Sequence, residues 1–372
     1  MSQLSGEKPR FEYIDQFRGL IVILMLLDHC SYYFNAIWDQ IDPLDPLLDS
    51  WGQFALRYAS YLCAPGFLMI AGAMVWWSWQ RQMDKGTAPW TARWQLIKRG
   101  LFLVILQMTW VNSSWGGFRE LLLEHIGIIA CLGISMIFLT FIISWNWKVR
   151  LGIGISILLI HPFLLKIPYN PDVTWERVIM QTFIDAGEFN KYPVIPWFAL
   201  AVLGSVMAVG WLKAWKTDKM RILWSSGIGA AALVISVIVR MGRGFGNIFS
   251  FSDFGSFSFF FDQKYPPSLY LNLWFFAFVV LLIAAFIAIN RISPKILLIF
   301  SIPGKVPLFF YGMHIAIMGV FVKRLDVFHL YREGGVVTTL IAFVIMLMVM
   351  LPLCWWFYGV KSRSRNAFIK MI

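Results

Sequence analysis

Residues 10–29 read RFEYIDQFRGLIVILMLLDH, an apolar stretch with ionisable residues at both ends and an Asp28–His29 pair inside it. Charged groups in the core of a bilayer cost several kcal/mol, so those that occur there usually serve a function. On a helix with about 100° per residue, Asp15, Arg18 and His29 fall within about 60° of one another, whereas Asp28 points about 100° away from His29. One helix face therefore carries an expected ion pair and, ~15–20 Å further along, an imidazole.

The composition of the whole chain is that of a membrane protein. Of its 372 residues 59% are hydrophobic and only 14% are charged, and the mean hydropathy is +0.68. A soluble chain carries about 25% charged residues. Apolar runs long enough to cross a bilayer recur along the sequence. We therefore expect an all-α, polytopic transmembrane helix bundle in which residues 1–372 form a single domain.

Ten membrane spans are predicted from these apolar runs. Alternate connections between them hold roughly two thirds of the 32 Lys and Arg residues, and most acidic residues lie on the opposite side. Basic connections stay in the cytoplasm, so both termini are expected there. The net charge of +12 thus indicates topology, and nucleic acid is not an expected partner. The predicted spans are 14–34, 55–79, 94–112, 125–145, 149–168, 193–212, 222–240, 268–289, 305–322 and 335–359.

Small residues within the spans predict packing rather than chemistry. Gly72 and Gly204 would let neighbouring helices approach closely. The four cysteines have no CxxC spacing, so buried side chains are expected and no metal or redox site is predicted. They are Cys30, Cys63, Cys131 and Cys354.

Two connections have an unusual character. The connection 241–267 is rich in Gly, Ser and Phe, which fits a segment that re-enters the membrane or caps a cavity. Aromatic loops of this kind either bind substrate or simply lie at the membrane interface. The apolar stretch 296–302 is too short to span, and we expect it along the inner interface.

Histidine is the side chain best suited to proton transfer near neutral pH. An imidazole can accept a proton from an attacking hydroxyl or amine, although a lone histidine in a membrane more often only hydrogen-bonds a neighbouring helix. Asp28 does not share the face of His29, so its expected partner is a His or Arg of another span. The five histidines are His29, His125, His161, His314 and His329.

Basic residues at the cytoplasmic start of the third span have two interpretations. Lys98 and Arg99 either anchor the helix or, with Arg18 at a comparable depth, bind the phosphates of a cytoplasmic donor. The sequence has no GxGxxG, Walker, HExxH or GxSxG signature, which argues against nucleotide hydrolysis, zinc proteolysis and ordinary serine hydrolysis.

The stretch YIDQFRGLIVILMLLDH at 13–29 resembles the opening of the bacterial membrane proteins similar to heparan-α-glucosaminide N-acetyltransferase, a group related to the integral-membrane acyltransferases. Other segments resemble the same family in the expected order, and the last two are the most specific. These segments are APGFLMIAG (64–72), Lys98-Arg99, EHIGIIACLG (124–133), YPVIPWFALAVLG (192–204), KYPPSL (264–269) and GKVPLFFYGMHI (304–315).

The resemblance implies acyl transfer across a membrane. In the named activity an acetyl group moves from cytoplasmic acetyl-CoA to an amino sugar on the far side. The resemblance also implies a multi-pass protein of the bacterial cytoplasmic (inner) membrane. The stretch 35–49 contains no histidine, so a covalent acetyl-histidine route just beyond the first span is not expected. Matches to family histidines and arginines fall on His29, His125, His314, Arg18 and Arg99.

The leading hypothesis is a membrane acyltransferase that uses acetyl-CoA as donor and a sugar or glycan amine or hydroxyl as acceptor. The candidate catalytic residues are His29, the proposed general base, His125, its support or substitute, and Asp28. The donor phosphates are assigned to Arg18, Lys98 and Arg99. Orientation of the acceptor or stabilisation of a developing oxyanion is assigned to Lys264, Tyr311 and His314.

Other functions remain open at this stage. A proton-coupled transporter or flippase of a glycan or small anionic solute would use Asp28 and the histidines. No inverted repeat is visible, although many transporters have one. A structural or signalling membrane protein is the third reading. Membrane lipid is an expected partner, and a homo-oligomer is left open.

Overall fold

The computed structural model describes residues 11–38, 50–119 and 125–372, which form helices and no strand. Most of the stretch 35–49, which contains no histidine, lies outside these ranges. The longer helices are α1 (Glu12–Phe34), α2 (Trp51–Ser60), α3 (Cys63–Asp84), α4 (Pro89–Leu106), α6 (Ile128–Ile142), α7 (Trp147–Leu164), α8 (Thr174–Phe183), α9 (Val194–Val209), α10 (Asp218–Met241), α12 (Leu269–Ile292), α14 (Pro307–Met318) and α15 (Val336–Arg363). Shorter helices are α5 (Asn112–Trp115), α11 (Phe257–Phe260), α13 (Leu298–Lys305) and α16 (Ala367–Met371).

Seven helical segments in the described ranges are long and apolar enough to cross a membrane. They correspond to seven of the ten predicted spans and confirm a membrane protein. The predicted span 305–322 belongs to a pair of helical segments bent by 75°, which would make an eighth. The spans predicted at 94–112 and 125–145 fall short, because α4 carries three basic residues and α6 has only 15 residues. The count of ten and the cytoplasmic termini therefore stay predictions.

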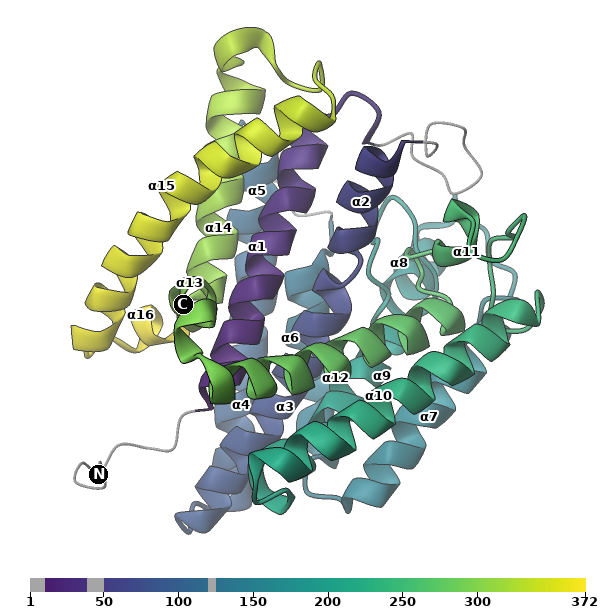
Figure 1. Ribbon diagram of the computed structural model, residues 1–372, viewed down its shortest axis with the longest axis vertical. Coiled ribbons are helices and arrows are strands. Elements are labelled where there is room, and N and C mark those ends of the chain that lie inside the picture. The colour runs from purple at the N-terminus through teal and green to yellow at the C-terminus, as the bar shows by residue number, and fades with distance from the viewer. Residues whose placement is uncertain (1–10, 39–49, 120–124) are drawn as a thin grey trace.

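Helices α1, α3 and α9 form the centre of the bundle. In their most apolar windows, 67% of α1 and 78% of both the α2–α3 and the α9 segments are buried, against 22% for α7, α10 and α15. The last three helices therefore face the lipid with apolar side chains. Figure 1 shows α10 and α12 running together obliquely to α1, with α13, α14 and α15 along the other flank of α1.

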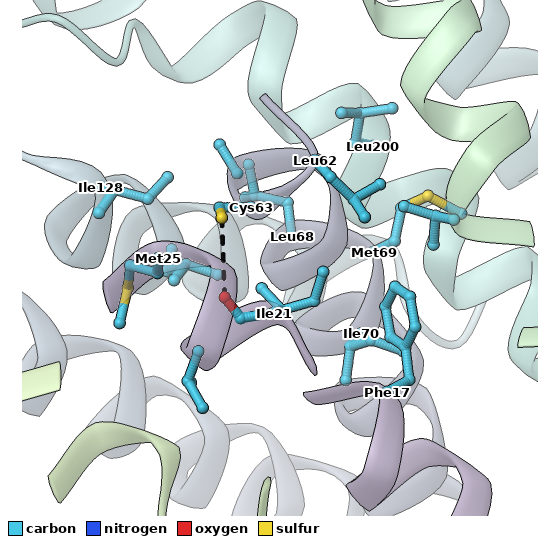
Figure 2. Packing of buried hydrophobic residues seen from close by; sticks show 14 of the residues in the cluster. Phe17, Ile21, Met25, Leu62, Cys63, Leu68, Met69, Ile70, Ile128 and Leu200 are labelled. Atoms are coloured by element: carbon cyan, nitrogen blue, oxygen red, sulfur yellow. Dashed lines mark hydrogen bonds between the residues drawn. The ribbon is translucent and has the colours of Figure 1, made fainter. Parts of the chain in front are cut away.

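The core between α1 and α3 is aliphatic and aromatic. Figure 2 shows Phe17, Ile21 and Met25 of α1 among side chains of α3, with Ile128 and Leu200 from α6 and α9 around them. The Cys63 thiol donates a hydrogen bond of 3.6 Å to the carbonyl of Ile21. All four cysteines are free and buried, which confirms the expectation from their spacing.

Glycine brings α3 and α9 into backbone contact. A Cβ on Gly72 would overlap the carbonyl oxygen of Ala201, and a Cβ on Gly204 would overlap that of Met69. The contact is reciprocal, since each helix presents a glycine to the backbone of the other. This confirms the predicted role of both glycines.

The same device fixes α13 against the first turns of α1. A Cβ on Gly19 would overlap the carbonyl of Phe300, and a Cβ on Gly304 would overlap that of Asp15. The segment 296–302, predicted to be too short to span, thus contributes to a short helix that is packed on α1. The bend of 75° follows at once and starts α14 at Pro307.

The connection 241–267 folds around one buried arginine. Arg240, in the last turn of α10, donates hydrogen bonds of 2.6–3.1 Å to four backbone carbonyls of the connection and to Asn247, and lies 3.4 Å from the Asp262 carboxylate. Asp262 accepts in turn from backbone amides, among them that of Phe249 at 2.7 Å. The connection is therefore an ordered structure, and it ends by carrying Lys264 into the bundle, where it is 5% exposed.

We predict that Gly72→Ala and Gly204→Ala each destabilise the protein, because a methyl group would force α3 and α9 apart. Overpacking of this kind costs about 1–3 kcal/mol. The matched controls are Gly152→Ala in α7 and Gly227→Ala in α10, where a Cβ meets nothing within 4 Å. The thermal midpoint of the purified protein in detergent should fall for the first pair only. Equal midpoints in all four variants would contradict the backbone contact.

Candidate functional site

Two histidines that lie far apart in the sequence meet in the core. His29, near the end of α1, and His314, on α14, have parallel rings with centroids 4.9 Å apart. Their Nδ1 and Nε2 atoms are 2.6 Å apart, and Nδ1 of His314 is 2.6 Å from the carbonyl oxygen of Phe310. Both imidazoles are buried. The pair therefore joins two helices through side chains that the apolar surroundings would otherwise exclude.

The hydrogen bonds define the tautomers of the neutral pair. A backbone carbonyl can only accept, so Nδ1 of His314 carries the proton shared with Phe310. Nε2 of His314 is then an acceptor, and Nδ1 of His29 must donate to it. Nε2 of His29 keeps its lone pair, which is the feature a general base requires.

Aromatic rings surround the histidine pair. Trp115 and Tyr311 make edge-to-face contacts with His29, at centroid distances of 4.9 and 5.8 Å. Trp115 ends α5, which follows a π-helical turn at Gln107–Val111, and Trp110 within that turn donates a 3.1 Å hydrogen bond to the carbonyl of Gly312 on α14. The π-helical turn thus ties the wall of the site to the helix that carries His314.

A second group of polar residues borders the pair, and we call it the Tyr61 cluster. It consists of Asp28, Arg57, Tyr61, Lys264 and Tyr265. The Lys264 ammonium lies 4.8 Å from the centre of the Tyr61 ring, and the Arg57 guanidinium lies 5.8 Å from it. Hydrogen bonds from Asn35 to Gln53 and from Cys63 to Ile21 hold the segment that carries Arg57 and Tyr61 along the part of α1 that carries Asp28. In the described ranges Asp28 has no ion pair within 4.0 Å, so its expected His or Arg partner stays a prediction.

A cavity of about 520 Å³ lies at the end of the bundle where α1 begins. Its walls come from α1, α3, α4, α6, α13, α14, α15 and the C-terminal residues, and no acidic residue is among the described residues that line it. We call it the basic cavity because its cationic lining residues are Arg18, Arg81, Lys85, Arg99, Lys305 and Lys361.

Tyr311 connects the basic cavity to the histidine pair. It lines the cavity, and its ring centroid lies 5.8 Å from those of both His29 and His314. Among the described residues that line the cavity, it is the one with ring contacts to both histidines. One phenol ring therefore lies between the basic cavity and the histidine pair.

The structure brings together some of the predicted residues and separates others. Arg18 and Arg99 both line the basic cavity, and Arg18 also bonds Asp15 at 3.3 Å, the ion pair expected from the sequence. Lys98 is exposed and is not among the residues lining the cavity. His125 lies 3.4 Å from the Glu188 carbonyl, and over the described ranges no hydrogen bond or ring contact joins it to His29.

His314, which was predicted to orient the acceptor or stabilise an oxyanion, contacts His29 directly, a contact that the sequence did not predict. Arg57 was not singled out, although an arginine inside the predicted span 55–79 was a usable signal. Tyr192, whose hydroxyl is 2.9 Å from that of Tyr265, had no such signal. In the described ranges, no three His, Cys, Asp or Glu residues are placed to hold a metal ion.

Comparison with known proteins now gives this geometry a context. No curated protein matches the chain significantly. The family of the catalytic region of heparan-alpha-glucosaminide N-acetyltransferase matches residues 10–248. The match contains Arg18, His29 and Arg99, and it ends before Lys264 and His314. Since it covers more than half of the chain, the protein belongs to the heparan-alpha-glucosaminide N-acetyltransferase family and is a membrane acetyltransferase.

Proposed function

We propose that the protein transfers an acetyl group from cytoplasmic acetyl-CoA to an amine or hydroxyl of a sugar or glycan on the other side of the bacterial inner membrane. The observation that carries this proposal is that Tyr311 both lines the basic cavity and contacts the rings of His29 and His314. Family membership supports acetyl transfer to glycans, and the charge asymmetry of the sequence supports the proposed direction across the membrane.

The basic cavity fits the donor chemically. Coenzyme A carries several phosphate charges, and the cavity presents six cationic side chains without a carboxylate among its described lining residues. Guanidinium groups such as those of Arg81 and Arg99 suit bidentate contacts with phosphate. A volume of about 520 Å³ lies within the usual range of ligand pockets. When bound there, the donor would supply an activated acetyl thioester.

His29 is the proposed general base. Its Nε2 takes the proton from the acceptor amine or hydroxyl, while Nε2 of His314 accepts a hydrogen bond from Nδ1–H of His29 and stabilises the imidazolium. The acceptor's nitrogen or oxygen forms the new bond to the acetyl carbon, the carbon–sulfur bond breaks, and His29 returns the proton to the leaving thiolate. His314 is a positioning residue in this scheme, and Tyr311 is placed to donate a hydrogen bond to the carbonyl oxygen.

His29→Ala should lower kcat for acetyl transfer by about 10²–10⁴-fold, because it removes the general base. Binding of acetyl-CoA should persist, since His29 does not line the basic cavity. Release of free CoA in the presence of amino-sugar acceptors measures the first quantity, and calorimetry the second. Full activity in this variant would remove the assignment, and proton-driven solute flux without any need for CoA would favour a transporter.

His314→Gln should retain more activity than His314→Leu, because glutamine offers an acceptor to Nδ1 of His29 and leucine does not. The leucine variant should lose about 10- to 100-fold in kcat, the worth of a hydrogen bond to a charged group, with the KM for acetyl-CoA unchanged. Equal losses in both variants, or a loss confined to KM, would argue against a positioning role through this hydrogen bond.

The double variant Arg81→Gln/Arg99→Gln should bind CoA about tenfold more weakly, as expected for the loss of partly exposed charged hydrogen bonds. The matched control is Lys219→Gln, which removes an exposed charge from the same predicted side of the membrane. Lys98→Gln then shows whether the neighbour of Arg99 contributes. An unchanged CoA affinity in the double variant would mean that the donor binds elsewhere.

A further inference from the structure

Aromatic rings hold the Arg57 guanidinium in place, and one of its N–H groups lacks a hydrogen-bond partner among the described residues. It stacks on the ring of Trp38, with its central carbon 4.4 Å from the ring centroid, and lies near Tyr61. Its Nε is buried and has no hydrogen-bond partner among the described residues. Stacking on aromatic faces leaves the N–H groups of a guanidinium pointing outward in its plane. A buried donor of this kind normally has a hydrogen-bond partner, so the Nε–H group of Arg57 can still donate to a ligand.

Lys264 places a second cation beside the first. Its side chain is 5% exposed, and the ammonium rests on the rings of Tyr61 and Tyr265 at 4.8 and 5.2 Å. Over the described ranges it makes neither a hydrogen bond nor an ion pair through its ammonium. Aromatic faces attract a cation but do not neutralise its charge.

The charges of the Tyr61 cluster do not balance. Two cations face a single carboxylate, that of Asp28, and neither cation lies within 4.0 Å of a described carboxylate oxygen. One oxygen of Asp28 is itself buried without a hydrogen-bond partner. An uncompensated charge in a weakly polar interior is costly, so a bound anion would stabilise the cluster.

The position of the cluster assigns this anion to the acceptor. Hydrogen bonds join Gln53 to Asn35 and Cys63 to Ile21, so the segment that carries Arg57 and Tyr61 runs along the part of α1 that holds His29, and the cluster adjoins the proposed base. None of its residues lines the basic cavity, where the donor phosphates would bind. Arg57 and Asp28 are only half-buried, so a ligand can reach them.

We propose that Arg57 and Lys264 form an anion-binding subsite, so that the natural acceptor carries a carboxylate or phosphate beside the group that is acetylated. The guanidinium of Arg57 binds two oxygens of the anion in its plane, and the ammonium of Lys264 attracts the same anion as a point charge. A neutral amino sugar would leave both cations unpaired. This inference rests on the proposed function only for the identity of the ligand as an acceptor.

Binding of amino sugars in the absence of acetyl-CoA tests the subsite directly. The probes are glucosamine, glucosamine 6-phosphate and muramic acid, which compare no anion, a phosphate and a carboxylate on similar rings. Calorimetry with the full-length protein in detergent should show at least one acidic sugar bound tenfold or more tightly than glucosamine. The acidic sugar that binds tighter identifies the anion. Arg57→Gln and Lys264→Gln should each abolish the preference.

The matched control is Lys191→Gln, which removes an exposed lysine next to Tyr192 and should leave the preference intact. CoA binding and thermal midpoint are measured on every variant. If the glutamine variants do not fold, Arg57→Lys decides, because it keeps the charge but loses the bidentate contact and should reduce the preference for the acidic sugar.

Equal affinity of the wild-type protein for neutral and acidic sugars would overturn the subsite. So would an acidic preference that survives both glutamine substitutions, or variants that lose kcat for acetyl transfer while keeping acidic-sugar affinity, because the cations would then act on the reaction alone. Failure of the wild-type protein to bind CoA or to transfer acetyl would instead overturn the proposed function and leave this result standing.

Discussion

The hydrogen bond between His29 and His314 is the interaction on which the site depends. Two imidazoles in an apolar bundle cost free energy unless each ring nitrogen has a partner, and here the carbonyl of Phe310 starts a chain that satisfies three of the four. The fourth, Nε2 of His29, is left for a ligand. The same chain that makes the burial of both rings tolerable therefore also sets the tautomer that a base needs.

The regions proposed for the donor and the acceptor are distinct. The basic cavity has cations and no described carboxylate, and Tyr311 is its boundary with the histidines. The Tyr61 cluster is a separate region, in which Arg57 and Lys264 both lie at the ring of Tyr61. Each region carries excess positive charge, yet no residue is shared between them. In the proposed mechanism the donor and an anionic acceptor would therefore bind different cations.

The helical class, seven of the spans and two residues of the basic cavity, Arg18 and Arg99, could be predicted from the sequence. Hydropathy identifies a span clearly only where a helix is both long and poor in charge. The spans predicted at α4 and α6 are not confirmed, because α4 carries three basic residues and α6 is short. Arg18 and Arg99 could be predicted as cavity residues because charge at a helix start is a local property. The contact of His29 with His314 could not, since it joins residues 285 positions apart and depends on how α14 leaves the bend.

Backbone packing explains how that distant contact is held. Gly19 and Gly304 let α13 lie directly on α1, with backbone atoms in contact at both positions. If α13 slid along α1, residues with side chains would replace the glycines at these contacts, and their Cβ atoms would overlap the facing carbonyl groups. The chain then turns through 75° at Pro307 and reaches His314 two helical turns later. Gly19 of α1 and Gly304 of α13 thus determine where His314 meets His29 near the end of α1. His314 lies beyond the family match to residues 10–248, but the first helix within that match positions it.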